Sequence, residues 1–209
     1  KLSNVHLLAR TRVVGSWGGS QVLALESCAG AGTGKHGEAD DNQIRERLWR
    51  ITPRRVIIAT GSAERAFLFA DNDRPGLMMS MAARGYLSRF GVVPGRKGIV
   101  FTNNDDAYLT AVALHKAGAE IVRIVDTRPH PEGMAAGMAM GAGVHLSFGS
   151  AISGIETDKS GRMISGVRII PTLRAAARGS APERVACDFV CMSGGFEPVV
   201  PELGSAFLD

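Results

Sequence analysis

Apolar and polar residues alternate through most of the first fifty positions. The runs NVHLLARTRVV and QVLALES flank Gly18 and Gly19, and this pattern is typical of two antiparallel strands joined by a turn. The run RERLWRITPRRVIIATG predicts a strand over residues 48–51, a turn at Pro53 and a second strand over residues 56–58. The chain therefore begins with short strands of a small sheet.

Two segments lack such a pattern. Residues 28–43 are rich in Gly and Asp and show almost no apolar periodicity, which predicts a mobile surface loop. Residues 172–182, TLRAAARGSAP, predict an exposed connector.

The pattern changes to helical spacing after residue 79. A helix is expected from about Ser80, with Gly91 and Pro94 as its stop signals. Residues 98–126 then read GIVFT, NNDD, AYLTAVALHKAG and EIVRIVD, which predicts strand, turn, helix and strand, with Gly118 at the helix end. This is the βαβ crossover of a parallel sheet.

The remaining third of the chain is predicted to be mainly strand. PEGMAAGMAMGAGV gives a weakly determined helix, VHLSFGSAISGIETDKSGRMISGVRII gives short strands with a turn at residues 159–161, and RVACDFVCMSGG gives a strongly β-prone run. In that last run Cys187 and Cys191 are four residues apart, so they are expected to share one face and to be buried.

Composition excludes several classes of protein. The 209 residues are 45% hydrophobic and carry a net charge of +4, and the Arg residues are scattered, which argues against a nucleic-acid partner. We find neither a membrane-spanning apolar run nor a signal peptide, so a soluble, cytoplasmic protein without membrane association is expected. The first residue is Lys, and the chain opens as if inside a sheet; we expect an internal fragment.

Motifs for metal binding and for hydrolysis are not evident. The five His residues have no metal-ligand spacing, and no nucleophile motif is present. Asp71 and Arg74 lie in an exposed turn, where an ion pair between them is favoured over a phosphate contact.

The turn of the predicted βαβ unit occupies the position of a Gly-rich dinucleotide-binding turn. Where three glycines would lie, the sequence has Thr102, Asn104 and Ala107. The first glycine normally permits the tight turn and the second lets the backbone approach pyrophosphate. Asn104 therefore adds side-chain volume where a diphosphate would lie.

Charged residues around this turn allow two interpretations. Asp126 ends the second strand, where a carboxylate can bind an adenosine ribose, and this indicates a modified nucleotide site. Alternatively, the fold is retained without the ligand, and Asp105 and Asp106 serve as N-caps of the helix. Crowding and negative charge both oppose a diphosphate, which favours the second interpretation.

Three stretches carry a resemblance to a known family. RLWRITPRRVIIATGSAERAFLFADNDRPG, VVPGRKGIVFTNNDDAY and DFVCMSGGFEPVVPEL resemble the alpha subunit of heterotetrameric sarcosine oxidase and, more distantly, subunits of opine oxidases and hydrogen cyanide synthase. The resemblance implies an α/β fold with two dinucleotide-binding domains, related to disulfide reductases, in which a Rossmann-like βαβ accompanies a small antiparallel sheet. The first, Gly-rich βαβ is missing from this chain.

The resemblance also implies domain boundaries and binding residues. Residues 1–93 with 186–209 would form part of an FAD/NAD-binding-type domain, and residues 94–185 an inserted second Rossmann-like domain. Ala59-Thr60-Gly61 and Ser193-Gly194-Gly195 match segments that pass the bound dinucleotide, although both occur elsewhere as simple turns, and Val13 matches a strand facing adenine. The candidate cofactor-binding residues are Val13, Ala59, Thr60, Gly61, Asn103, Asn104, Asp126, Ser193, Gly194 and Gly195.

Function follows from the resemblance as an expectation. The family's alpha subunit holds NAD noncovalently, FAD or another adenine nucleotide is an alternative, and FMN lies at the interface with the beta subunit; gamma and delta subunits complete the heterotetramer. This chain would be a nucleotide-binding and structural part of an amine-oxidising oxidoreductase, with catalysis in the partner and no catalytic residue of its own. An assembly domain without nucleotide and an opine oxidase subunit are the alternatives. Ala66 departs from an expected Pro, and the family's folate-binding part is absent.

Overall fold

The structure is a computed structural model that describes residues 3–17, 21–28, 44–131, 133–172 and 181–199. Its contacts divide the chain into unit 1, Lys1–Gly61 with Pro198–Asp209, and unit 2, Ser62–Glu197. The boundaries expected at residues 93/94 and 185/186 fall inside unit 2. The assignment of family domains to these segments stays a prediction.

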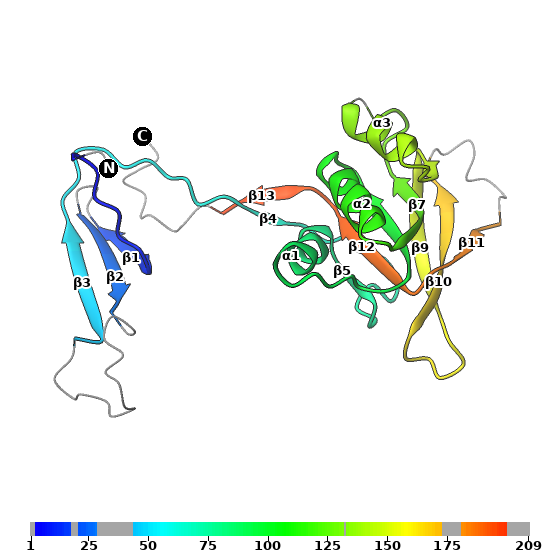
Figure 1. Cartoon of the computed structure of the whole chain (residues 1–209), viewed down its shortest axis with the longest axis horizontal. Helices are drawn as coiled ribbons and strands as arrows, with labels where there is room; N and C mark the ends of the chain where they lie inside the picture. Colours follow the sequence, from blue (N-terminus) through cyan, green and yellow to red (C-terminus); the bar gives the residue numbers. More distant parts are fainter. Residues whose placement is uncertain (1–2, 18–20, 29–43, 132, 173–180, 200–209) are drawn as a thin grey trace. The chain divides into compact units, whose positions relative to one another are not determined.

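Unit 1 contains a three-stranded antiparallel sheet (Figure 1). Its strands, in spatial order, are β1 Thr11–Trp17, β2 Gln21–Ser27 and β3 Glu46–Ile51. The predicted hairpin and the predicted strand over residues 48–51 are thus confirmed. Val22 and Ala24 of the central strand are buried, as alternation along one face of a strand requires.

The second predicted strand, residues 56–58, is wrong. These residues make no regular strand, and Ile57 is 92% exposed. A strand needs a neighbour to pair its backbone groups, and none of the described residues provides one here. The predicted loop and connector fall mostly on residues 29–43 and 173–180, which lie outside the described residues, as do Gly18 and Gly19.

The central element of unit 2 is a five-stranded parallel sheet (Figure 1). In spatial order its strands are β5 Leu77–Met79, β12 Phe189–Ser193, β6 Lys97–Thr102, β7 Glu120–Asp126 and β8 Leu146–Ser147. Three helices accompany it: α1 Ser80–Phe90, α2 Asp106–Lys116 and α3 Met134–Gly141. The predicted βαβ crossover is confirmed as β6, α2 and β7.

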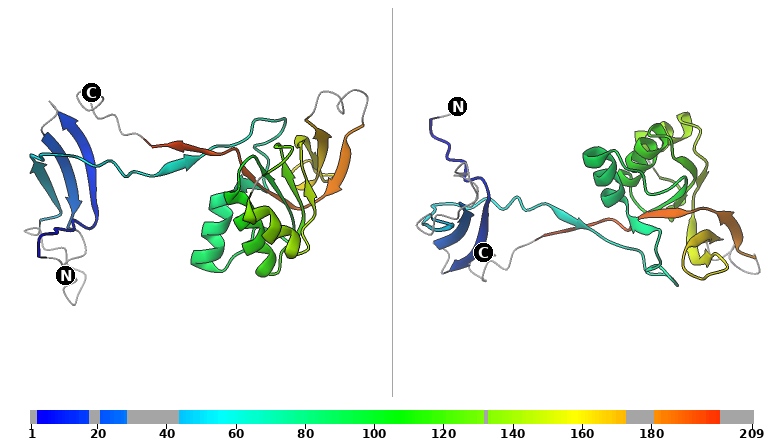
Figure 2. Two further views of the ribbon diagram at one scale, coloured as in Figure 1. Left: turned by 90° about the horizontal axis from the view of Figure 1, so that it is seen from above. Right: turned by 60° about the horizontal axis from the view of Figure 1, so that its bottom comes forward.

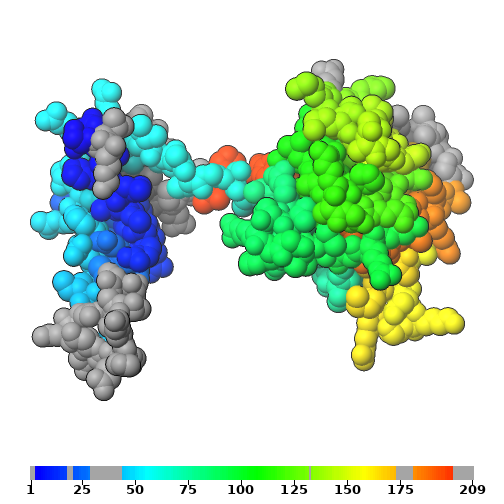
Figure 3. Space-filling model, in the orientation of Figure 1, coloured from blue at the N-terminus to red at the C-terminus, as the bar shows by residue number. Residues whose placement is uncertain are grey.

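Unit 2 has three layers (Figure 2). One hydrophobic cluster joins the sheet to all three helices. The three helices lie against one another in the space-filling view (Figure 3). A second cluster joins the opposite face of the sheet to an antiparallel sheet. That sheet contains β9 Ser150–Thr157, β10 Ile164–Pro171 and β11 Glu183–Ala186, with the turn at residues 159–161 as predicted.

The ends of the helices follow the sequence signals. Gly91 caps α1 in the left-handed conformation, with φ of 66°, and Gly118, with φ of 94°, follows the C-cap Ala117 of α2. Only glycine adopts such angles at little cost. β4 Ser62–Glu64 pairs with β13 Phe196–Pro198 in a separate two-stranded ribbon. None of the described helices is long and apolar enough to cross a membrane.

The two C-terminal cysteines lie on opposite faces of the parallel sheet, so the expectation of one shared face is wrong. Cys187 belongs to the cluster beneath the antiparallel sheet, and Cys191 belongs to the cluster beneath the helices. The reason is a break in the strand at Asp188, whose carboxylate accepts hydrogen bonds from the backbone amides of Arg96 and Lys97. Burial of both thiols is confirmed, and it raises each pKa to about 12.

Buried thiols with raised pKa values predict selective alkylation. At pH 8, iodoacetamide should modify the half-buried Cys28 while Cys187 and Cys191 stay protonated and protected; denaturant should expose all three, as peptide mass spectrometry would report. Because their folded pKa values exceed the ordinary 9.0, both thiols contribute stability below pH 9 that is lost as the pH rises toward 12. Rapid labelling of either thiol in the native protein would contradict their burial.

The close contact between β6 and β12 gives a second prediction. A Cβ atom on Gly98 would overlap the ring of Phe189, which is fully buried. Gly98→Ala should therefore destabilise the protein by about 1–3 kcal/mol through overpacking. Gly137→Ala in α3 is the control, because a Cβ there meets no atom within 4 Å. Urea unfolding of both variants measures the difference, and equal midpoints would refute the packing argument.

Candidate functional site

Three of the predicted cofactor-binding residues line one pocket of unit 1. Val13, Ala59 and Thr60 surround a cavity of about 440 Å³, together with Val22 and residues 56–58. Its size is within the range of small-molecule sites. Most of its wall is aliphatic, so the pocket suits a flat, weakly polar group such as a heterocyclic base.

Thr60 is the polar residue that lines this pocket, and Gly61 follows it in the chain. The hydroxyl of Thr60 donates to the carbonyl of Val199, and the amide of Val199 donates to the carbonyl of Gly61 at 3.0 Å. Gly61 has φ of 76°, and a Cβ placed on it would meet no atom within 4 Å. The backbone at Gly61 is therefore open to an approaching ligand in unit 1.

The other predicted residues gather in unit 2, at the carboxyl ends of β6 and β12. The side-chain amide of Asn104 donates to the hydroxyl of Ser193 at 2.9 Å and to its carbonyl at 3.1 Å. The amide of Asn103 donates to the carbonyl of Gly194 at 3.2 Å. The structure thus brings these residues together, but it uses their donors within the protein.

The two glycines after Ser193 serve a close backbone packing. The amide of Gly194 donates to the carbonyl of Arg65 at 2.7 Å, and the amide of Arg65 donates to the carbonyl of Gly195 at 2.8 Å. A Cβ on Gly194 would lie 3.0 Å from the carbonyl oxygen of Arg65. Gly195 has φ of 95°. Segment 65–66 therefore occupies the space that these glycines leave.

Asp126 lies at the centre of a buried network. Its carboxylate is completely buried and accepts hydrogen bonds from the hydroxyl of Tyr108 at 2.7 Å and from the backbone amide of Arg128 at 2.8 Å. The guanidinium of Arg128 also donates to both carboxylate oxygens, with a shortest distance of 2.8 Å. Burial and the neighbouring Asp126 carboxylate raise the pKa of Tyr108, and the hydrogen bonds that Arg128 donates to Asp126 raise the pKa of Arg128.

The two acidic residues of the turn are paired with arginines. Asp105 accepts from Arg128 at 2.7 Å, and Asp106 accepts from Arg84 at 2.8 Å. Asp105 occupies the N-cap position of α2 but makes no side-chain capping hydrogen bond. The expectation that the pair caps the helix through side chains is therefore wrong, because the arginines bind these carboxylates more strongly than an amide would.

Several groups that a dinucleotide would need at this turn are already bonded within the protein. The carboxylate expected to bind ribose is already surrounded by Tyr108 and Arg128, and the position of the second glycine holds the side chain of Asn104. The side-chain oxygen of Asn104 is buried without a partner among the described residues, but it is an acceptor and cannot bind phosphate oxygens, which are acceptors too. The side-chain amide groups of Asn103 and Asn104 are therefore not free to donate to a diphosphate.

Sequence reasoning missed the basic members of this network. Arg128 follows two residues after Asp126, and an Asp followed closely by a basic residue at a strand end was the available signal. Arg84 was not predictable as a partner of Asp106, since the two are joined only by the packing of α1 on α2. The ion pair between Arg74 and Asp71, at 2.9 Å, is confirmed.

Comparison with known sequences gives two informative relatives. The chain is 36% identical over 200 residues to sarcosine oxidase subunit alpha of Rhizobium meliloti (strain 1021), covering 95% of this chain and 18% of that protein. It is 37% identical to the subunit of the same name from Corynebacterium sp. (strain P-1), covering 92% of this chain and 19% of that protein. The chain is related to sarcosine oxidase subunit alpha. It spans less than a fifth of the length of these relatives, and no family model matches it.

Solved structures confirm the fold class inferred from the resemblance to sarcosine oxidase alpha subunits. Thioredoxin reductase from Lactococcus lactis aligns with a TM-score of 0.59 at 16% identity, over 90% of this chain and 54% of that one. A NAD-dependent persulfide reductase from A. fulgidus aligns with a TM-score of 0.57 at 14% identity, over 95% of this chain and 33% of that one. Over the region shared with sarcosine oxidase alpha subunits, the chain has an α/β fold of the disulfide-reductase type.

The buried network predicts a large effect of removing its cation. Arg128→Met leaves the carboxylate of Asp126 buried without a counter-charge and should lower the free energy of unfolding by about 3 kcal/mol. Arg74→Met breaks an exposed ion pair and should cost at most about 1 kcal/mol. Urea denaturation compares the two.

Restoring neutrality provides the control for this prediction. Asp126→Asn combined with Arg128→Met should recover part of the loss, because no unpaired charge then remains and Tyr108 can still donate to the amide oxygen. A double variant as unstable as the sum of its single variants would show that no charge coupling joins Asp126 and Arg128.

Proposed function

We propose that this chain is the adenine-nucleotide-binding and structural part of an amine-oxidising oxidoreductase, and that unit 1 holds the nucleotide. One observation carries the proposal: Val13 lines the same pocket as Ala59 and Thr60, which follow it by more than forty positions in the sequence. The relationship to sarcosine oxidase alpha subunits supports the reaction class.

The pocket supplies binding rather than chemistry. Val13 and Ala59 offer apolar surface for an adenine ring, and the open backbone at Gly61 allows close approach of a phosphate or ribose. Thr60 adds a hydroxyl that can donate or accept. The nicotinamide or flavin end of the ligand, in NAD or FAD, would supply the redox chemistry, and this chain contributes no catalytic residue in the proposal.

Unit 2 is proposed to act as scaffold. The side-chain nitrogen of Asn104 and the charges around Asp126 are bonded within the protein, so the βαβ crossover can support the sheet without a ligand. The same observation favours a second candidate function, an assembly domain that binds no nucleotide at all.

Catalysis is proposed to take place in a partner subunit. The relatives are named as alpha subunits, which supports a hetero-oligomer with beta, gamma and delta subunits. FMN at the interface with the beta subunit and sarcosine as the amine substrate complete the proposal. A cytoplasmic location is part of the same hypothesis.

Nucleotide release tests the proposal directly. The full-length natural protein, purified and denatured, should release about one equivalent of NAD or FAD, identified by mass. Val13→Glu should reduce that content at least tenfold, because a carboxylate in the apolar pocket repels the ligand and must itself be desolvated. Val14→Glu is the matched control, since Val14 is an adjacent exposed residue that does not line the pocket.

Unit 2 provides the complementary measurement. Asn104→Gly should leave the nucleotide content unchanged if unit 1 is the site. Loss of nucleotide in this variant would indicate that the nucleotide binds at the turn of unit 2 instead. Absence of any nucleotide from the natural protein would favour the assembly domain.

A further inference from the structure

Unit 1 has a second cavity, of about 440 Å³, on the other face of its three-stranded sheet. The residues that line it come from the start of β1 and from the neighbouring β2 and β3: Arg10, Thr11, Arg12, Leu25, Ser27 and Glu46. Successive residues of a strand point to opposite faces. Because Val13 lines the nucleotide pocket, Arg12 and its cross-strand partner Leu25 face away from that pocket. We call the second cavity the arginine pocket.

The backbone of Arg10 is unusual. Its φ is 53°, a left-handed conformation that is uncommon for residues other than glycine and that concentrates at binding sites. In a regular strand, Thr11 would point away from both of its neighbours. The break in alternation at Arg10 accounts for three consecutive residues lining one cavity.

Two cations of the arginine pocket lack a counter-charge. The guanidinium groups of Arg10 and Arg12 make no hydrogen bond or ion pair with any residue that the structure describes. Elsewhere in the same sheet, Arg47 is paired with Glu26 at 3.2 Å. Two positive charges two positions apart repel each other, and an anion that binds both removes that repulsion.

The acidic residue of the arginine pocket lies across its floor. Ser27 is the cross-strand partner of Glu46 on β3, and the backbone amide of Ser27 donates to the carbonyl of Arg10 at 3.0 Å. Two strand spacings, roughly 10 Å, therefore separate the backbones of Arg10 and Glu46. Glu46 makes no ion pair with an arginine in the described part of the chain. The cavity thus has a basic side, an acidic side and a hydroxyl group between them.

This arrangement suits a phosphate monoester that also carries hydroxyl groups. A monoester bears nearly two negative charges at neutral pH, and guanidinium groups bind its oxygens through paired hydrogen bonds. The carboxylate of Glu46 can accept hydrogen bonds from sugar hydroxyl groups, as carboxylates do from ribose. Leu25 provides apolar surface for the carbon skeleton. A simple anion would use only the basic side.

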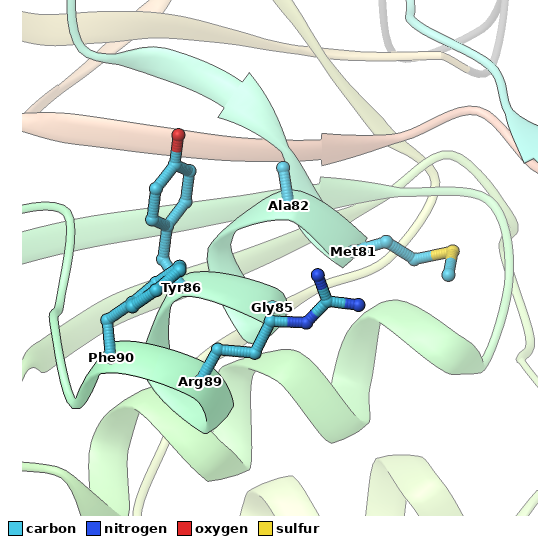
Figure 4. Close-up of a pocket in the computed structure, with 6 residues that line it drawn as sticks. All are labelled: Met81, Ala82, Gly85, Tyr86, Arg89 and Phe90. Carbon is cyan, nitrogen blue, oxygen red and sulfur yellow. The ribbon is translucent and has the colours of Figure 1, made fainter. Parts of the chain in front are cut away.

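The cavity on α1 in unit 2 lacks this combination of charges. It has a volume of about 410 Å³, and Figure 4 shows its lining. Among the described residues that line it, Arg89 alone carries a charge, beside Tyr86 and Phe90. A single guanidinium without a facing carboxylate or hydroxyl-lined floor does not match a sugar phosphate.

We propose that the arginine pocket binds a sugar phosphate, with the phosphate group on Arg10 and Arg12 and a sugar hydroxyl group on Glu46. The proposal does not depend on the nucleotide pocket, which lies on the opposite face of the sheet. A free sugar phosphate and the ribose phosphate of a nucleotide present the same chemistry to these residues, and titration with each distinguishes the two sources.

Calorimetric titration of the full-length natural protein with ribose 5-phosphate tests the site. We expect one equivalent to bind, at least tenfold more tightly than inorganic phosphate, and ribose without phosphate to give no measurable binding. AMP is titrated into the Val13→Glu variant, whose nucleotide pocket is blocked. Binding of AMP there as tight as that of ribose 5-phosphate identifies a nucleotide as a source of the ligand, and loss of AMP binding identifies a free sugar phosphate.

Substitutions on the basic side separate binding from folding. Arg12→Gln should weaken the binding of ribose 5-phosphate at least tenfold. Arg50→Gln is the matched control, because Arg50 is an exposed arginine of the same sheet that does not line the cavity, and its effect should stay within about twofold. Arg10→Gly should also weaken binding tenfold without lowering the midpoint of thermal unfolding, since glycine adopts a positive φ at little cost.

The acidic side gives a change of opposite sign for two ligands. Glu46→Gln should weaken the binding of ribose 5-phosphate at least threefold, because an amide accepts hydroxyl groups less strongly than a carboxylate does. The same variant should bind inorganic phosphate more tightly, because a negative charge has been removed from the cavity. A variant that had merely lost its fold would weaken both ligands.

Three outcomes overturn the proposal. They are no binding of ribose 5-phosphate, equal weakening by Arg12→Gln and Arg50→Gln, and binding that Val13→Glu abolishes while Arg12→Gln leaves it unchanged. The last outcome would assign the sugar phosphate to the nucleotide pocket. Nucleotide content is measured in the same preparations, so that failure of the arginine pocket and failure of the proposed nucleotide site are distinguished.

Discussion

A completely buried carboxylate, Asp126, determines how the carboxyl edge of the parallel sheet is organised. A buried charge is tolerated only when a counter-charge and hydrogen bonds replace water. Arg128 provides both, and Tyr108 provides a further donor from α2. Because Arg128 also binds Asp105, the same guanidinium connects the end of β7 to the start of the crossover helix. The end of one strand, the turn after another and the helix between them are thereby fixed together.

The sequence predicted the regular parts of unit 2 because their local and tertiary signals agree. The crossover of β6, α2 and β7 has apolar strands, a helix with helical periodicity and a glycine after its end, all pointing to one structure. Residues 56–58 show the limit of this reasoning. Their apolar, β-branched character is strand-like, but a strand also needs a paired neighbour, and single-sequence patterns do not reveal whether one is present. The break at Asp188 is similar, since it depends on the amides of Arg96 and Lys97, far away in the sequence.

The sequence indicated which candidate site residues lie together, but it did not indicate which groups their side chains bind. Val13 lies beside Ala59 and Thr60 in unit 1, and Asn104 lies beside Ser193 in unit 2. These residues are far apart in the sequence, and only the resemblance to a family indicated that they belong together. The position of Asp126 at the end of the βαβ unit allowed it to bind a ribose, whereas the structure pairs it with Arg128. Nothing in the spacing of an Asp reveals whether its partner will be a ribose hydroxyl or a protein cation, because both satisfy a carboxylate.

The buried packing of α2 and the pairing of the turn's carboxylates with arginines explain how the βαβ crossover is stable without glycines in its turn. Packing of α2 on the sheet depends on Tyr108, Ala111 and Leu114, which are completely buried. The turn before the helix needs only its charges balanced, and Arg84 and Arg128 balance them from within.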